Sequence, residues 1–182
     1  MRNLGSYCLY HYFEKDKGPF RNLSSLSIEK ASEISNEIRN KGKVFASQRS
    51  DDYMIIRRDL ERISRELFIA KGGKPGNTFP HYMVLDSCEW LESWYRDSDK
   101  IAIDLDEFTE TSISFTYGDL FPTMRFEDNK PYRKQIYTKQ EIMEVIKKFG
   151  LPQEWNRYGD KGPERYIEVQ VWDEEVLQRY MV

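Results

Sequence analysis

A single carboxylate stands in the middle of an alternating segment near the end of the sequence. In the segment 166–172, Ile167, Val169 and Val171 share one face, and the other face carries Tyr166, Glu168, Gln170 and Trp172. A carboxylate between large aromatic side chains is costly on a packed face unless it is paired or lines a cleft. Glu168 is therefore a candidate catalytic residue, and Gln170 beside it is a candidate substrate-binding residue. A cross-strand pair with Arg133 or Lys134, or exposure on an outer sheet face, is the structural alternative.

A histidine occupies the middle of a second alternating segment. His11 lies in the segment 7–13, on the face that also carries Tyr7, Leu9 and Phe13. A histidine in that position is either a hydrogen-bonded core residue or a group that faces a ligand. Both interpretations stay open for His11.

Motifs for metal ligation and for common nucleophilic sites do not occur in the sequence. The two histidines, His11 and His81, are far apart, and there is no HxH, HExxH, CxxC or Cys/His cluster. GxSxG, the P-loop and GxGxxG are also missing. We therefore expect no metal site and no tightly bound cofactor, and we expect Cys8 and Cys88 to be free thiols.

Basic residues gather on one predicted helix, which covers residues 51–70. It carries Arg57, Arg58, Arg62 and Arg65, and Lys71 and Lys74 follow it. Such a row suits a phosphate backbone. The interspersed acidic residues Asp59, Glu61 and Glu66 instead favour a solvated face with ion pairs along the helix. Nucleic-acid binding through this helix therefore stays an alternative function.

The composition predicts one folded domain. The sequence has 182 residues, a net charge of -3 and an aromatic content of 14%. This charge excludes a strongly basic nucleic-acid footprint over the whole protein, and the aromatic content excludes a disordered chain. Many Tyr and Trp residues also favour a cleft with aromatic walls. The sequence contains no signal peptide and no apolar run long enough to span a membrane, so we expect a cytoplasmic protein without a membrane partner.

The order of predicted elements favours an α+β domain over residues 1–182. We expect three to four helices, and a mixed or mainly antiparallel sheet, because helices and strands do not alternate one for one. The predicted helices cover 27–42, 51–70, 87–95 and 138–149; the predicted strands cover 7–13, 81–85, 101–105, 112–117, 133–137 and 166–172, with a short strand or connector at 43–46. Residues 71–80 contain three Gly and two Pro and predict a mobile surface loop.

Two resemblances to known families add to this interpretation. Over nearly its whole length the sequence is similar to a family of uncharacterised proteins from Bacillus-type bacteria, in the segments 9–14, 18–22, 67–73, 114–119 and 162–170. The order of an early strand with His11, a central strand ending in Tyr117 and a late strand with Glu168 also resembles the His–Tyr–Glu order of ADP-ribosyltransferase-like folds.

The second resemblance implies a site. His11 would hold the nicotinamide-side ribose, Tyr117 would stack on nicotinamide, and Glu168 would stabilise the oxocarbenium-like transition state. Tyr12 and Arg21 would be substrate-binding neighbours of this pocket, and NAD would be the substrate. The alternative function is a non-catalytic binding module that recognises a protein or a nucleotide-like ligand through its aromatic residues.

Overall fold

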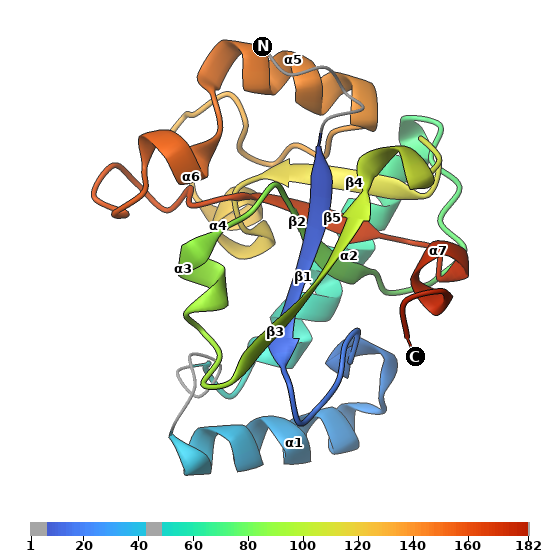
Figure 1. The fold of residues 1–182 in the computed structure, drawn as a ribbon, viewed down its shortest axis with the longest axis vertical. Helices are drawn as coiled ribbons and strands as arrows, with labels where there is room; N and C mark the ends of the chain where they lie inside the picture. Colours follow the sequence, from blue (N-terminus) through green and yellow to red (C-terminus); the bar gives the residue numbers. More distant parts are fainter. Residues whose placement is uncertain (1–6, 43–48, 182) are drawn as a thin grey trace.

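The computed structural model describes residues 7–42 and 49–181, and in these residues the protein is an α+β domain (Figure 1). The short strand or connector expected at 43–46 lies outside the described residues. Five strands form one open sheet in the order β3-β1-β2-β5-β4, and every pairing between neighbouring strands is antiparallel. The strands are β1 (Cys8–Glu14), β2 (His81–Leu85), β3 (Ser98–Asp104), β4 (Ile113–Tyr117) and β5 (Ile167–Val171).

The two faces of the sheet differ in chemistry because neighbouring residues of a strand point to opposite sides. One face is apolar and packs against helix α5 (Lys139–Phe149) and the short helix α7 (Glu175–Gln178). The opposite face packs against helices α2 (Tyr53–Ala70), α3 (Glu89–Glu92) and α4 (Leu120–Arg125). The second face carries buried polar side chains, among them Ser114, Thr116, Glu168 and Gln170.

Local capping signals explain where the two amphipathic helices at the ends of the molecule begin. Helix α1 (Ile28–Lys41) begins at Ser27, whose side chain accepts from the amide of Lys30, and it ends at Gly42 in a left-handed conformation. Helix α5 begins with the capping box of Thr138 and Glu141. The long helix 51–70 is also present, as α2, and it begins without a side-chain cap. Asp52 is the first flanking residue, and the Ser50 hydroxyl donates to the Asp52 carboxylate.

Other boundaries differ from the expectation. Residues 131–134 form a turn, and only Tyr137 of the expected strand 133–137 pairs with β4, through an isolated bridge to Phe115. The structure also contains helices that were not predicted, namely α4, α6 (Pro152–Trp155) and α7. Each spans only four to six residues. So short a segment shows too little periodicity to be distinguished from a turn.

The glycine- and proline-rich loop 71–80 is held by hydrogen bonds at several points. The amide of Lys74 donates to the Thr111 carbonyl, and the amide of Asn77 donates to the Trp172 carbonyl. The Arg65 guanidinium donates to the carbonyls of Pro75 and Asn77. These contacts oppose the mobility expected from the composition of the loop.

No helix within the described residues combines the length and the apolar character needed to cross a membrane.

Candidate functional site

A cleft of about 170 Å³ opens on the polar face of the sheet. Its floor is formed by β1, β2 and β5, and its walls come from the first turns of α2 and α4 and from the α3 region. Glu168 lies at this floor and is 7% exposed. Charged and aromatic side chains line the cleft. They are Arg49, Tyr53, Arg57, Asp119, Phe121, Tyr166 and Glu168, together with Tyr10, His11, Tyr12, Tyr82 and Trp94.

Flat aromatic surfaces make up much of the walls. Tyr53 at the start of α2 and Phe121 in α4 stack with ring centroids 4.9 Å apart and an interplanar angle of 2°. The Arg49 guanidinium lies 4.4 Å from the centre of the Tyr53 ring, and so extends this wall with a cation. A cleft of this kind favours planar ligands, because aromatic rings prefer parallel, offset contact with other rings.

The Glu168 carboxyl group is held from three directions. Its Oε1 atom accepts from the backbone amide of Leu120 and from Gln170 Nε2, each at 3.3 Å. Its Oε2 atom lies 3.3 Å from the Tyr166 hydroxyl. Burial raises the pKa of Glu168 well above its usual range, and the nearby charge of Asp119 raises it further.

The hydrogen bonds around Tyr166 also favour a protonated Glu168. The Tyr166 hydroxyl lies 2.9 Å from Asp119 Oδ2 and 3.3 Å from Glu168 Oε2, but it has a single hydrogen to donate. If that hydrogen goes to Asp119, the contact with Glu168 is a hydrogen bond only when Glu168 is protonated and donates. Asp119 also caps α4 by accepting from the amide of Phe121. The shorter contact of Tyr166 with Asp119 and the burial of Glu168 together favour the neutral acid at Glu168.

A nearly buried arginine of α2 lies beside the floor of the cleft. Arg57 is 9% exposed; its Nε donates to Glu61 Oε1 at 2.9 Å and its Nη2 donates to Asn22 Oδ1 at 3.2 Å. Its guanidinium lies 5.0 Å from the centre of the Tyr82 ring. Within residues 7–42 and 49–181, Nη1 of Arg57 has no hydrogen-bond partner. Arg57 is thus fixed by its surroundings and keeps one donor group for a ligand.

Two further residues proposed from the sequence, Tyr12 and His11, also line the cleft. The Tyr12 hydroxyl accepts from the Cys88 amide at 2.9 Å, and burial raises the pKa of Tyr12 to about 12. Both ring nitrogens of His11 are occupied by backbone groups. Nδ1 donates to the Tyr82 carbonyl, and Nε2 accepts from the Phe20 amide, each at 2.9 Å. Burial lowers the pKa of His11 to about 4, so His11 is neutral and has no free nitrogen for a ribose.

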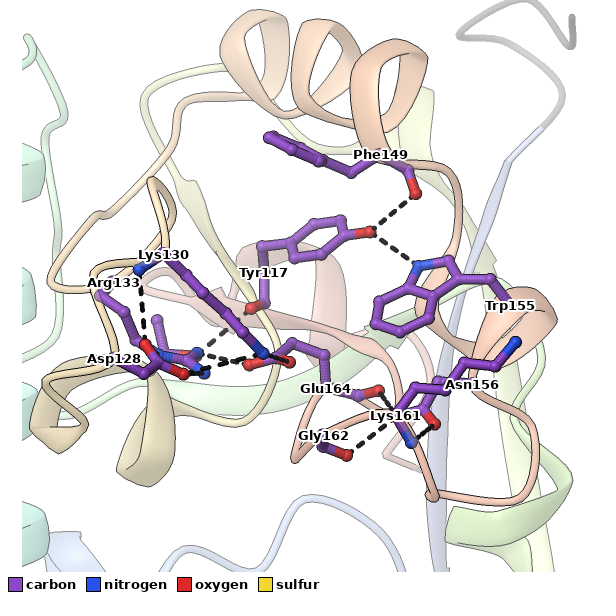
Figure 2. A network of polar contacts seen from close by, with 11 residues as sticks. Tyr117, Asp128, Lys130, Arg133, Phe149, Trp155, Asn156, Lys161, Gly162 and Glu164 are labelled. Carbon is purple, nitrogen blue, oxygen red and sulfur yellow. Dashed lines mark hydrogen bonds and ion pairs between the residues drawn. The ribbon is translucent and has the colours of Figure 1, made fainter.

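Tyr117 does not reach the cleft, so the expected convergence of His11, Tyr117 and Glu168 does not occur. The register of β4 and β5 places Tyr117 opposite Ile167, on the apolar face, whereas Thr116 lies opposite Glu168. Figure 2 shows the Tyr117 hydroxyl between the Phe149 carbonyl and the Trp155 indole, whose Nε1 donates to it at 3.0 Å. Tyr117 is fully buried there.

Figure 2 also shows a cluster of ion pairs near Tyr117. Glu164 is 1% exposed and pairs with Lys130 at 3.1 Å and with Arg133. Arg133 donates twice to the Asp128 carboxylate, at 2.8 Å each. Two acidic and two basic side chains therefore neutralise one another, and Arg133 is not a partner of Glu168.

The remaining predicted binding residues take different positions. Arg21 is exposed and does not line the cleft. Gln170 is completely buried below Glu168, where its amide donates to Thr116 and Glu168 and its carbonyl accepts from the Ser114 hydroxyl. Gln170 therefore orients Glu168 and has no access to a ligand.

The arginines of α2 are mostly engaged within the protein. Arg58 donates to the carbonyls of Ser24 and Leu26, and Arg65 holds the loop 71–80. Arg57 belongs to the cleft, and Arg62 pairs with Asp59 and Glu66 on the exposed face. A row of cations available to a phosphate backbone is therefore not present along this helix.

Sequence reasoning missed Asp119, Tyr166 and Arg57 as members of the cleft. Asp119 had a detectable signal, because an aspartate after Gly118 and before an apolar turn is typical of a helix N-cap. Arg57 and Glu61 also have the spacing of a helical ion pair, but only the tertiary structure reveals that this pair is buried.

No group of three or more His, Cys, Asp or Glu side chains is placed to hold a metal ion in the part of the chain that the structure describes. Comparisons with protein-family models, curated proteins and solved structures return no match. The function must therefore be argued from the cleft itself.

Proposed function

We propose that this protein binds a small planar ligand, of the size of a single ring system of a nucleotide, in the cleft above Glu168. The observation that carries this proposal is the parallel aromatic wall of Tyr53 and Phe121 beside a floor of fixed polar groups. An apolar, concave surface with a few convergent polar groups is typical of small-molecule sites. The volume of about 170 Å³ suits one ring system better than an extended dinucleotide.

Binding of nucleosides and nicotinamide, measured by calorimetry and by quenching of intrinsic fluorescence, tests this proposal. We expect at least one of adenosine, guanosine, cytidine, uridine and nicotinamide, or of their anionic forms AMP and nicotinate, to bind. Phe121→Ala should weaken that binding roughly tenfold or more, because stacking of a base on an aromatic ring contributes about 1–3 kcal/mol. Phe126→Ala is the matched control, since Phe126 lies at the end of the same helix, is exposed and does not line the cleft. Equal binding by wild type and Phe121→Ala, or no binding by any of these compounds, would contradict the proposal.

ADP-ribosyl transfer from NAD is a second candidate, favoured by the position of Glu168 in the cleft. Two features count against it. A neutral Glu168 stabilises a developing positive charge poorly, and Tyr117 cannot stack on a nicotinamide bound in this cleft. The binding function is therefore the better supported of the two.

The enzymatic candidate is tested by NAD cleavage with purified wild type and Glu168→Gln. Release of nicotinamide by wild type that disappears in the variant would support ADP-ribosyl chemistry. Unchanged or undetectable cleavage in both proteins would leave binding as the function of the cleft. A protein partner and a cytoplasmic location stay predictions from the sequence.

A further inference from the structure

We propose that the ligand of the cleft carries an oxyanion, a carboxylate or a phosphate, that is bound jointly by Arg57 and by the protonated carboxyl group of Glu168. This inference rests on the proposed function, because it names the chemistry of the ligand that the aromatic wall holds. The oxyanion would be bound by the donors that remain once the hydrogen bonds within the protein are satisfied.

The charges that line the cleft favour an anion. Arg49 and Arg57 contribute two positive charges, and Asp119 contributes one negative charge. Glu168 adds none in its protonated form, which its burial and the nearby charge of Asp119 favour. The negative charge of Asp119 is also directed away from a ligand, since its oxygens accept from the Phe121 amide and the Tyr166 hydroxyl. Glu61, which pairs with Arg57 at 2.9 Å, carries a second negative charge, so the charges around the cleft balance; what favours an anion is that both arginines line the cleft whereas Glu61 does not.

The donors of the floor are fixed before a ligand arrives. Glu61 and Asn22 orient Arg57 through Nε and Nη2, and among the residues that the structure describes Nη1 has no partner, so both of its hydrogens remain for a ligand. Glu61 itself is completely buried and also accepts from the Tyr82 hydroxyl at 2.8 Å. A guanidinium that is held by other groups loses little freedom on binding, which favours recognition of carboxylate and phosphate.

Glu168 has the complementary role of a neutral donor. Its Oε1 atom is engaged by Leu120 and Gln170, so the proton lies on Oε2, which contacts Tyr166 at 3.3 Å. That contact is long for an O–H···O hydrogen bond, so an oxyanion in the cleft can compete for the proton. Ionised Glu168 would instead repel the oxyanion. The groups that face Glu168 are Asp119, Tyr166, Tyr82 and Arg57.

Matched ligand pairs test the inference. We expect AMP to bind at least tenfold more tightly than adenosine, or nicotinate at least tenfold more tightly than nicotinamide, because each pair differs in the oxyanion. The two pairs distinguish phosphate from carboxylate. Inorganic phosphate should bind more weakly than AMP, since it has no ring to stack on Tyr53 and Phe121.

Three variants connect the preference to the named residues. Arg57→Lys keeps the charge and loses the fork of donors, and it should reduce the preference for the anionic member of the pair. Arg62→Gln, on the exposed face of the same helix, should leave it unchanged. In wild type the preference should fall as the pH rises and Glu168 ionises. Glu168→Gln keeps a neutral donor, so at pH values above about 7, where the phosphate of AMP is already a dianion, its preference should not change with pH.

The outcomes separate this inference from the proposed function. Equal affinity for the charged and neutral members of both pairs, with binding lost in Phe121→Ala, would overturn the oxyanion and leave the aromatic cleft as a binding site. Absence of binding by every compound would overturn both. A preference that persists in Arg57→Lys and has the same pH profile in wild type and Glu168→Gln would show that other residues hold the anion. If Arg57→Lys fails to fold, the ligand pairs and the Glu168→Gln profile still decide the question.

Discussion

Glu168 and Tyr117 lie on opposite faces of the sheet, although their strands are hydrogen-bonded neighbours. Tyr117 is paired with Ile167, and Glu168 is paired with Thr116. One position of register therefore decides that Glu168 faces a cleft and that Tyr117 is buried under α5. This register also determines the chemistry of the cleft, because the side chains that surround Glu168 are Asp119, Tyr166 and Arg57, and Tyr117 is not among them.

Replacing Glu168 by glutamine should stabilise the fold at neutral and alkaline pH. The pKa of Glu168 is raised in the folded state, so its contribution to stability is present at low pH and is lost as the pH rises above the unfolded value. Glutamine has the shape of the protonated acid and does not ionise. Denaturant unfolding at pH 5 and pH 8 should show an advantage for Glu168→Gln that is larger at pH 8. Glu127→Gln, at an exposed pair with Lys134, is the control and should give no such gain. A gain that does not depend on pH would contradict a neutral Glu168.

Removal of the Tyr166 hydroxyl should destabilise the protein. Tyr166→Phe leaves buried Glu168 without one partner and removes one hydrogen bond to Asp119. We expect a loss of about 1–3 kcal/mol in the free energy of unfolding, the usual cost of an unsatisfied buried polar group. Tyr158→Phe serves as the control because Tyr158 is 86% exposed. Similar unfolding midpoints for the two variants would argue against the shared hydroxyl.

His11 should make stability fall as the medium becomes acidic. Its pKa is lowered to about 4 in the folded state and is about 6.5 when unfolded, so the unfolded state takes up a proton first as the pH falls. The stability that neutral His11 provides is fully present above pH 6.5 and is lost towards pH 4, by about 3 kcal/mol. His11→Gln retains a donor and an acceptor without a charge, and its unfolding curve should depend less steeply on pH. Parallel curves for the two proteins across this range would refute the assignment.

The ion-pair network around Glu164 should matter more for stability than the exposed pairs. Glu164→Ala leaves the buried Arg133 with Asp128 alone, so we expect a loss of about 3 kcal/mol, at the low end of the range for breaking a buried pair. Glu127→Ala, which removes an exposed pair with Lys134, should have a much smaller effect on stability, because solvent screens exposed ion pairs. Urea titrations of both variants give the comparison, and equal losses would contradict the importance of burial.

Hydrogen exchange tests whether the loop 71–80 is mobile. The amides of Gly73, Lys74 and Asn77 donate to the carbonyls of Phe68, Thr111 and Trp172. These three amides should exchange slowly, on the time scale of the neighbouring β5 amides and not of a free loop. Rapid exchange at Lys74 and Asn77 would support the mobility that the composition predicts.

Local signals were enough to predict much of the fold. The alternation in 166–172 identified β5, and the predicted strand 112–117 and helix 138–149 are present as β4 and α5. Each of these patterns is contained in a few consecutive residues. The α+β class then followed from the order of the elements, and the structure confirms it.

The site was harder to predict, because it depends on contacts between distant segments. The sequence predicted the strands that carry Tyr117 and Glu168, but only the register of β4 with β5 determines which of their residues share a face. The sequence places Arg57 among exposed residues of a helix, because its burial depends on contacts with Asn22 and Tyr82 from other parts of the chain. The position of Glu168 in a cleft agrees with the expectation that a carboxylate on a packed face is costly in free energy unless it is paired or lines a cleft. The catalytic role of Glu168 stays a prediction.

The sheet order also has a consequence for how the protein is made. Strand β5 is the last of the five in the chain, yet it lies between β2 and β4. While the polypeptide emerges from a ribosome, β2 and β4 each expose an unpaired edge until residues 167–171 have left the exit tunnel. Nascent chains stalled before this point should therefore be prone to aggregation and should depend on chaperones, and they should become protected once β5 has emerged.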